Sequence, residues 1–586
     1  MTPLAFNVPI SEVLSKVYTV LETGKRIKIV PLTFLEICSL NTRGTNGSPN
    51  GSEQVSPIVD TVHFGTDGWR AIIGEDFNFR SVARVAAATA LVYRHYQQDS
   101  FASTEQTPNT PSAASPNTPP AASPNTPPAA IPNTILIGYD CRQDAGRYAV
   151  LAATVIASYG FDVKISDRYC PTPALCWTIG QDPSLIGGLM LTSSHNPAEY
   201  LGIKLRMQDG GASPQAFTSA VESALQDDLP ACFDNALDNF QAATNGTPDQ
   251  PATSIKTAPQ LHFTDIMSAY LKALYDFVDA PLIRQAGLKV VVDPLFGAGR
   301  DYLAHLLESL GVQVAQVNGA NDPSFAGLHP EPILPWVQAG ADKVVSLGYD
   351  ACFVTDGDAD RIGALDETGT YVTSHRILAL IIGHLVEDRG MYGRVVRTQA
   401  GSNLLRRQCD RLGLTLTTRP IGFKWIYQEM LAGDVLIGGE ESGGMGIPSH
   451  VRERDGLLMA LLLTELMAQK GKKLRGLVTD LTDELGTLEY NRRDLRLTPE
   501  QKEAFLSAHV TKDTFALTYY QDLFTPLGET LTDIDRSDGI KFNLDSDAWL
   551  MIRASGTEPL VRVYAEAQSM AQVQSLLDLG CQLAQG

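Results

Sequence analysis

The amino-acid sequence predicts an α/β fold, with three related α/β domains of mixed sheets followed by a small α+β domain. The 586 residues are too many for one hydrophobic core, so several domains are expected. Three separated segments repeat the same order of strand, turn, helix, helix-ending glycine and strand. From residue 488 onward, short alternating strands and a terminal helix from Met570 replace this order.

The composition is typical of a globular protein. Hydrophobic residues make up 44% of the chain and charged residues 19%. A formal net charge of -20 argues against nucleic acid or an anionic membrane surface as a partner. The eight cysteines contain no CxxC pair, and no apolar run approaches the roughly 18 residues that span a membrane. We therefore expect a cytoplasmic protein with no nucleic-acid or membrane partner.

The first domain is expected at residues 61–240, after an N-terminal extension at 1–60 that has a different, linker-like character. A helix is predicted from about Phe79 to Gln97. An insertion at 105–133 follows, in which SPNTPPAA occurs twice, and prolines this dense cannot join a helix or sheet. We favour a tolerated surface insertion, with a contact to another protein as the alternative.

The three repeated units set the other domain boundaries. Their first strands are predicted at 135–140, 289–293 and 394–398, and their second strands at 162–166, 312–317 and 414–418. Each helix between them ends at a glycine, which makes the units βαβ-type. The second domain is therefore expected at 258–373, the third at 374–487 and the α+β domain at 488–586.

Ser194 and His195 follow a predicted buried strand, and Pro197 stops the strand from continuing. In α/β proteins, reactive side chains are commonly presented at the carboxyl end of a strand. A polar turn after a core strand is the alternative for this stretch alone.

The loop after the next domain's buried strand predicts a cation site. Asp356, Asp358 and Asp360 alternate along it, so their carboxylates point the same way and repel unless a hard cation lies between them. Mg²⁺ is the simplest ion for such oxygen ligands. An EF-hand is disfavoured because its sixth position needs glycine and holds Arg361 here; an acidic surface turn is the remaining alternative.

Two later loops have side chains suited to a sugar phosphate. Glu440 and Ser442 alternate in a Gly-rich turn and can bond vicinal hydroxyls, with a plain turn as the alternative. Lys424 follows a strand end and is placed to meet an anion, unless it is a surface lysine. The loop Arg553-Ala-Ser-Gly-Thr557 suits a phosphate, with an Arg-capped turn as the alternative. A serine and a Mg²⁺ site together suggest phosphoryl transfer.

With these residues the chain resembles the α-D-phosphohexomutase family, specifically the phosphoglucomutase/phosphomannomutase enzymes, from about residue 62 to the C-terminus. The matching segments occur in order through all four domains: Phe64-Gly-Thr-Asp-Gly-Trp-Arg70, Thr192-Ser-Ser-His-Asn-Pro197, Asp356-Gly-Asp-Ala-Asp-Arg361, Gly439-Glu-Glu-Ser442 and Arg553-Ala-Ser-Gly-Thr557. Neither the N-terminal extension nor the proline-rich repeat belongs to the family pattern.

The resemblance implies four domains around a central cleft and interconversion of α-D-glucose 1-phosphate and glucose 6-phosphate. It implies a phosphoserine at Ser194, a glucose 1,6-bisphosphate intermediate, and one Mg²⁺ per chain. The metal would be held by the Ser194 phosphate with Asp356, Asp358 and Asp360. Arg70 and Lys204 match positions beside the transferring phosphoryl group, and His195 lies next to the nucleophile. The residues implied to bind the hexose phosphate are Arg361, Lys424, Glu440, Ser442, Arg553, Ser555, Gly556 and Thr557.

One departure from the family pattern affects the expected chemistry. Some relatives have lysine where this chain has Arg454, and arginine is not deprotonated in practice. We therefore assign proton transfer to Lys204 and His195. Mannose-phosphate or dual specificity, and net hexose 1,6-bisphosphate synthesis, are alternatives to the glucose-phosphate mutase. A non-catalytic sugar-phosphate binder is disfavoured because the serine and the three aspartates are intact.

Overall fold

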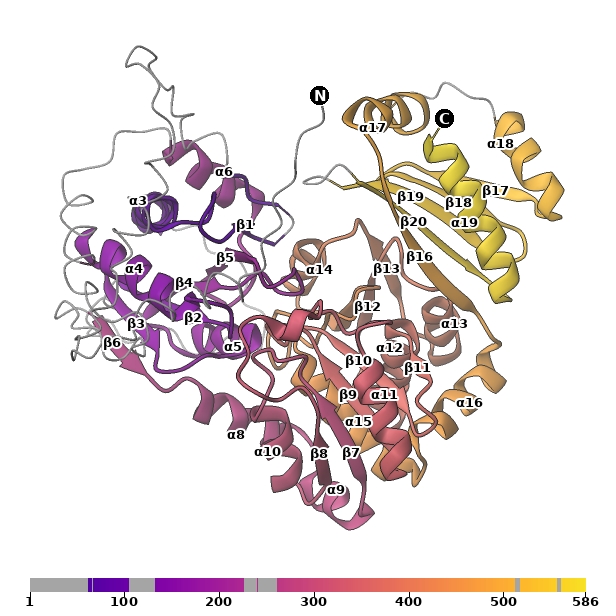
Figure 1. Ribbon diagram of the computed structural model, residues 1–586, viewed down its shortest axis with the longest axis horizontal. Helices are drawn as coiled ribbons and strands as arrows, with labels where there is room; N and C mark the ends of the chain where they lie inside the picture. The colour runs from indigo at the N-terminus through magenta and orange to yellow at the C-terminus, as the bar shows by residue number, and fades with distance from the viewer. Residues whose placement is uncertain are drawn as a thin grey trace, which may run out of the picture. The chain divides into compact units, whose positions relative to one another are not determined.

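Among the residues that the computed structural model describes, the strands form four sheets (Figure 1). The described residues are 62–65, 67–104, 132–225, 240, 261–511, 517–555 and 560–585. The N-terminal extension, nearly all of the proline-rich insertion, and Gly556 and Thr557 lie outside them, so what we expect of these segments stays a prediction. No helix in the described part of the chain is long and apolar enough to cross a membrane.

The first sheet has the strand order β1-β5-β4-β2-β3-β6 and mixes parallel with antiparallel pairs. Its strands are β1 (Trp69–Ile72), β2 (Thr134–Tyr139), β3 (Asp162–Ser166), β4 (Leu185–Leu191), β5 (Tyr200–Met207) and β6 (Leu261–Thr264). Its helices are α3 (Phe79–Thr104), α4 (Ala145–Ser158), α5 (Thr172–Gln181) and α6 (Gln215–Ala224). Helix α3 begins where predicted but continues past Gln97, because no glycine or proline occurs before Pro108.

The second sheet has the order β11-β10-β9-β7-β8. Strands β9, β7 and β8 are parallel to one another. Its strands are β7 (Lys289–Asp293), β8 (Gln313–Gln316), β9 (Ala351–Thr355), β10 (Ile362–Asp366) and β11 (Tyr371–Val372). Its helices are α8 (Met267–Phe277), α9 (Ala280–Ala286), α10 (Tyr302–Ser309), the short η3 (Phe325–Gly327) and α11 (Gln338–Leu347).

The third sheet, β13-β12-β14-β15, is parallel except at β15. Its strands are β12 (Arg394–Thr398), β13 (Leu416–Arg419), β14 (Val435–Gly439) and β15 (Met445–Gly446). Its helices are α12 (Ser374–Gly383), η4 (His384–Asp388), α13 (Asn403–Leu412), α14 (Phe423–Met430), α15 (Gly456–Lys470) and α16 (Leu474–Leu485). The prediction of three mixed α/β sheets is thus confirmed.

The fourth sheet is wholly antiparallel, with the order β16-β20-β19-β18-β17. Its elements are β16 (Glu489–Arg496), α17 (Pro499–Phe505), η5 (Leu506–Val510), α18 (Leu517–Phe524), η6 (Thr525–Leu527), β17 (Leu531–Asp535), β18 (Ile540–Leu544), β19 (Trp549–Ala554), β20 (Leu560–Ala567) and α19 (Met570–Gln585). Figure 1 shows α19 lying across one face of this sheet. Val573, Leu576 and Leu577 of α19 pack into the same apolar cluster as the strands, so the fourth domain has its own core.

Helix α15 lies in a core that the first three sheets share. Every residue from Gly456 to Met467 is buried, as expected for a helix that is apolar on all sides. The apolar cluster around it includes Leu175 of α5, Tyr270 of α8 and Leu303 of α10. Asp455 caps the helix N-terminus by accepting a hydrogen bond from the backbone N–H of Leu458 at 2.9 Å.

Shortening a buried side chain of α15 tests whether this helix lies in the core. Leu462 is 0% exposed, so Leu462→Ala should lower the free energy of unfolding by about 2–5 kcal/mol through lost burial and the cavity left behind. The matched control is Leu431→Ala, because Leu431 is 52% exposed and should change stability by less than about 1 kcal/mol. Urea denaturation followed by circular dichroism measures both; equal effects would contradict the assignment of α15 to the core.

Candidate active site

Ser194 lies in the loop after β4, where the strand ends as predicted. Its side chain is 0% exposed, and its φ of 51° is unusual for a residue other than glycine. The Ser194 backbone N–H donates to Thr192 Oγ1 at 2.9 Å. Its hydroxyl donates to Asp356 Oδ2 at 2.8 Å and lies 3.5 Å from His195 Nδ1. The structure therefore brings the serine of the first domain to the acidic loop of the second.

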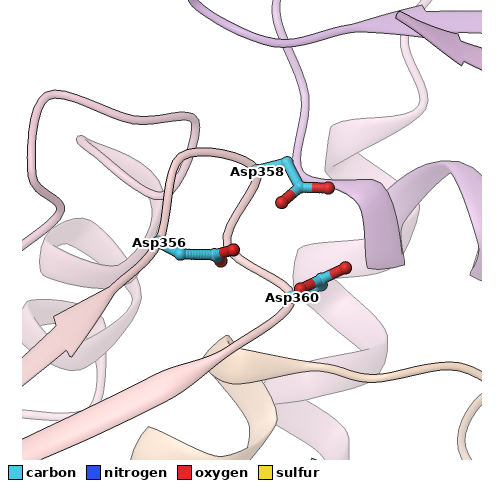
Figure 2. A group of neighbouring side chains, drawn as sticks. All are labelled: Asp356, Asp358 and Asp360. Atoms are coloured by element: carbon cyan, nitrogen blue, oxygen red, sulfur yellow. The ribbon is translucent and has the colours of Figure 1, made fainter. Parts of the chain in front are cut away.

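The three aspartates of that loop converge, as predicted. Asp356, Asp358 and Asp360 follow β9, and all three are 0% exposed. Figure 2 shows the side chains turned toward one another, and one carboxylate oxygen from each lies within 4.8 Å of the others. Among the described residues, Asp358 Oδ1 and Asp360 Oδ1 are buried without a hydrogen-bond partner. Three buried carboxylates, two of which have an oxygen without a hydrogen-bond partner, fit a hard divalent cation such as Mg²⁺.

Two cationic side chains from outside the acidic loop pair with these carboxylates. Lys204 of β5 places Nζ 2.8 Å from Asp358 Oδ2, 2.8 Å from Asp360 Oδ2 and 3.0 Å from Asp67 Oδ2. Arg454, just before α15, pairs with Asp360 at 2.8 Å and also with Asp67. The buried negative charge is thus balanced by residues that lie far from it in sequence.

The protonation of these groups follows from burial and charge. Burial raises the pKa of Asp356 well above its usual range, and repulsion from Asp360 and Asp358 raises it further. Burial acts against the charged form of Lys204, but the carboxylates of Asp358, Asp360 and Asp67 outweigh it and raise its pKa. Lys204 is therefore an ammonium at neutral pH and can donate a proton but not accept one.

His195 and Arg70 complete the surroundings of Ser194. Burial, followed by the nearby positive charges of Arg361 and Arg70, lowers the pKa of His195 well below its usual value. The imidazole is therefore neutral at physiological pH. Arg70 donates from Nη1 to Asn196 Oδ1 at 2.8 Å, which places its guanidinium at the serine loop.

The Gly-rich loop between β14 and β15 is joined to the acidic loop through the backbone. Arg361 and Gly444 form an antiparallel bridge, and the Ile362 N–H donates to the carbonyl of Gly443 at 3.0 Å. Glu440 is 6% exposed and lies 3.4 Å from Arg454, while Ser442 is half-buried in the turn. Arg454 also pairs with Asp360 at 2.8 Å, so one side chain contacts both predicted loops. Within the acidic loop, Arg361 lies 3.9 Å from both Asp356 and Asp360.

The predicted phosphate residues form a second group. Arg553 of β19 donates to Asp538 Oδ1 at 2.8 Å, and the Ser555 N–H donates to the carbonyl of Leu560. Burial, and then the positive charge of Arg553, lowers the pKa of the Lys424 ammonium, so the two cations lie close enough to repel. Within the described part of the chain, neither Arg553 nor Lys424 has a hydrogen bond or ion pair to Asp356, Asp358 or Asp360.

Two contributors at the aspartates were not predicted from sequence as site residues. Asp67 lies inside the segment that also contains Arg70, and it pairs with Lys204, Arg206 and Arg454. Thr172, at the start of α5, donates its hydroxyl to Asp358. The sequence around Asp67, a carboxylate between glycines near an arginine, could have indicated a site residue. Thr172 could not have been found this way, because a threonine at a helix start is common.

The chain also matches known proteins along most of its length. Family models described as phosphoglucomutase/phosphomannomutase α/β/α domains I, II and III and C-terminal domain match residues 125–230, 268–369, 373–485 and 512–579. A phosphoglucomutase/phosphomannomutase of Thermococcus kodakarensis is 31% identical over 450 residues, which are 77% of this chain and 89% of the relative. A phosphoglucosamine mutase of Ruminiclostridium cellulolyticum is 27% identical over 508 residues, covering 86% and 94%.

A solved structure agrees with these matches. The crystal structure of a candidate phosphomannomutase from Thermus thermophilus superposes with a TM-score of 0.69 and 28% identity, covering 90% of this chain and 99% of that one. Together the fold and the matches define a phosphohexomutase-type protein. The chain belongs to the phosphoglucomutase/phosphomannomutase family. The resemblance inferred from the sequence is confirmed.

Metal binding gives a first test of the acidic loop. Asp358→Asn removes one charged ligand, so Mg²⁺ should bind at least about 10-fold more weakly in isothermal titration calorimetry. Asp350→Asn, a carboxylate that pairs with Lys473 outside the loop, is the control and should bind Mg²⁺ as the wild type does. Equal affinity in all three proteins would place the metal elsewhere.

The ionisation of Glu440 gives a second test. Burial raises the pKa of Glu440 to about 7 from its ordinary 4.5. The folded chain then keeps a proton that the unfolded chain loses, so the stability from this group is fully present below pH 4.5 and is lost as the pH rises through 7.

Glu440→Gln cannot ionise. Relative to the wild type it should therefore gain up to about 3 kcal/mol of stability as the pH rises through that window. Urea denaturation of both proteins at several pH values across the window measures the difference. A difference that does not change with pH would refute the raised pKa.

Proposed function

We propose that the protein is a phosphoglucomutase that interconverts α-D-glucose 1-phosphate and glucose 6-phosphate through a phosphoserine at Ser194. The observation that carries the proposal is the buried Ser194 hydroxyl, 2.8 Å from Asp356 and beside the convergent carboxylates. A buried serine at a divalent-cation site suits phosphoryl transfer, in which positioning and charge neutralisation supply most of the catalysis. A cytoplasmic location stays a prediction.

In the transfer step, the bond between phosphorus and Ser194 Oγ breaks while a bond to a sugar hydroxyl oxygen forms. The product is glucose 1,6-bisphosphate, and the proton lost by the sugar hydroxyl balances the proton gained by Ser194 Oγ. The bisphosphate then returns its other phosphate to Ser194 by the same step in reverse. Each turnover therefore regenerates the phosphoserine and moves the phosphate between the two ends of the sugar.

In the proposed mechanism, some polar side chains transfer protons and others bind the phosphate. We assign acceptance of the sugar proton to His195, which lies 3.5 Å from Ser194 Oγ, and protonation of the leaving oxygen to the Lys204 ammonium. Arg70 and Arg361 would hold the equatorial phosphate oxygens; Arg70 lies at the serine loop and Arg361 beside Asp356, which supports this assignment. One Mg²⁺, held by Asp356, Asp358 and Asp360 together with the Ser194 phosphate, would neutralise charge on the transferred group.

The remaining loops suit the rest of the substrate. Glu440 and Ser442 alternate on the turn after β14 and would hydrogen-bond the sugar hydroxyls. Arg553, Ser555, Gly556 and Thr557, with Lys424, would bind the phosphate that does not react. The mutual repulsion of Lys424 and Arg553 supports this assignment, because an anion between them would relieve it.

The names of similar proteins support other sugars as alternatives to glucose. One relative is named as a phosphoglucosamine mutase, another carries both glucose and mannose in its name, and the Thermus structure is described as a candidate phosphomannomutase. A hexose 1,6-bisphosphate synthase remains the other alternative within this chemistry. Initial rates on the 1-phosphates of glucose, mannose and glucosamine, each with and without glucose 1,6-bisphosphate, separate these activities; activity on none would indicate a non-catalytic binder.

Removal of the nucleophile tests the mechanism directly. Ser194→Ala should lower kcat by at least about 10³-fold and abolish the single phosphate that the proposal predicts on Ser194, as measured by intact-mass analysis and peptide mapping. Ser193→Ala is the matched control, because Ser193 is the adjacent buried serine and its Oγ has no hydrogen-bond partner among the described residues. It should keep both the phosphate and the turnover. If Ser194→Ala turned over at the wild-type rate, the phosphoserine mechanism would be wrong.

A further inference from the structure

We propose that Arg142 is a positioning residue for phosphoryl transfer, whose buried guanidinium fixes Ser194 by binding the backbone carbonyls of its loop. The inference rests on the proposed function and adds to it a residue that does not touch the substrate. Arg142 follows β2 and is 3% exposed, and no role for it was expected from the sequence.

The guanidinium of Arg142 donates hydrogen bonds to four backbone carbonyls, three in the loop after β4 and one at the first residue of β5. Its Nη2 donates to the carbonyls of Ser194 at 2.6 Å and Asn196 at 2.7 Å. Its Nη1 donates to those of Pro197 at 2.6 Å and Tyr200 at 3.0 Å. The carbonyls of Ser194 and Asn196 lie outside any strand, so this planar donor group takes the place of a sheet partner for them. The Pro197 carbonyl also accepts from the Tyr200 N–H at 3.1 Å. One side chain therefore holds the chain at four points between Ser194 and Tyr200.

The amino side of Ser194 belongs to the same network. The Ser194 N–H donates to Thr192 Oγ1, and this hydroxyl donates to Asp140 Oδ2 at 2.6 Å. Asp140 Oδ2 in turn accepts from Nε of Arg142 at 3.2 Å. Ser194, with a positive φ, is thus held on both sides by a closed ring of hydrogen bonds. A backbone conformation of this kind persists only when its surroundings impose it.

The second domain packs against the same group. The ring of Phe325 in η3 lies 4.9 Å from the Arg142 guanidinium carbon, within range of a cation–π contact. Gly357, between two of the aspartates, approaches so closely that a Cβ there would lie 2.3 Å from the Ser194 carbonyl oxygen. The carbonyl that Arg142 holds is therefore also the surface on which the acidic loop rests.

These contacts connect Arg142 to the reaction. Ser194 Oγ must stay at a set position relative to the acidic loop, because misplacement of a reacting group by about 1 Å can slow a reaction about 10²-fold. Lysine keeps the positive charge of Arg142 but has one nitrogen, which cannot reach all four carbonyls and Asp140. Arg142→Lys therefore changes geometry while it keeps charge.

The experiment measures one transfer step on folded enzyme. Wild type and Arg142→Lys are phosphorylated with glucose 1,6-bisphosphate, freed of ligand and mixed with excess glucose 1-phosphate. Because each turnover restores the phosphoserine, the phosphate first placed on Ser194 carries an isotope label, and transfer of that label from Ser194 to the unlabelled sugar is followed by quenched flow. The single-turnover rate constant, which does not depend on how much protein is folded, should fall at least about 30-fold, while KM for glucose 1-phosphate changes less than about 3-fold.

Arg389→Lys is the matched control. Arg389 donates to Glu465 and to the carbonyl of Phe277, between helices of the second and third sheets. This variant should lower the melting temperature but keep the wild-type rate constant. If Arg142→Lys also kept the wild-type rate constant, the inference would be overturned.

A second variant covers the case in which Arg142→Lys does not fold. Thr192→Val keeps the shape of the side chain but removes the hydroxyl that links Ser194 to Asp140, and it should slow the transfer about 10-fold. A rate constant within about 2-fold of the wild type would then count against the network. If the wild type itself fails to transfer phosphate from Ser194, the proposed function fails instead, which distinguishes the two outcomes.

Discussion

The site depends on the compensation of buried negative charge. Asp356, Asp358 and Asp360 lie together with no exposure to solvent, a state that is strongly unfavourable for carboxylates without partners. Lys204 comes from the first sheet and Arg454 from the chain that enters α15. The acidic loop of the second sheet therefore reaches its arrangement only when the first and third sheets are also in place.

The packing of the core serves this compensation. Asp455, next to Arg454, caps α15 and also accepts a hydrogen bond from the Tyr270 hydroxyl at 3.0 Å. The start of α15, which is buried from Gly456 to Met467, is thus fixed to α8, and Arg454 reaches the carboxylates from a position just before this buried helix rather than from a surface loop. Placement on rigid elements is what the precision of a catalytic site requires.

Local order could be predicted from the sequence, and long-range partners could not. Strand β3 occupies the predicted residues 162–166 because hydrophobic pattern and helix-ending glycine act over a few residues. The convergence of the aspartates followed from their alternation along one loop. Lys204, however, meets Asp358 across 154 residues, and Arg142 binds carbonyls more than fifty residues away. Such pairs depend on topology, and a carbonyl acceptor leaves no mark in the sequence at all.

The backbone bridge between Arg361 and Gly444 has a consequence for the substrate's movement. It joins the loop of the aspartates to the loop of Glu440 as one hydrogen-bonded piece, so neither can follow a ligand without the other. In the proposed reaction, both ends of the sugar must in turn face Ser194. Because the two loops are joined, the sugar itself must rotate between the two transfer steps. The same donors and acceptors of the loops must then bind the sugar ring in two opposite orientations.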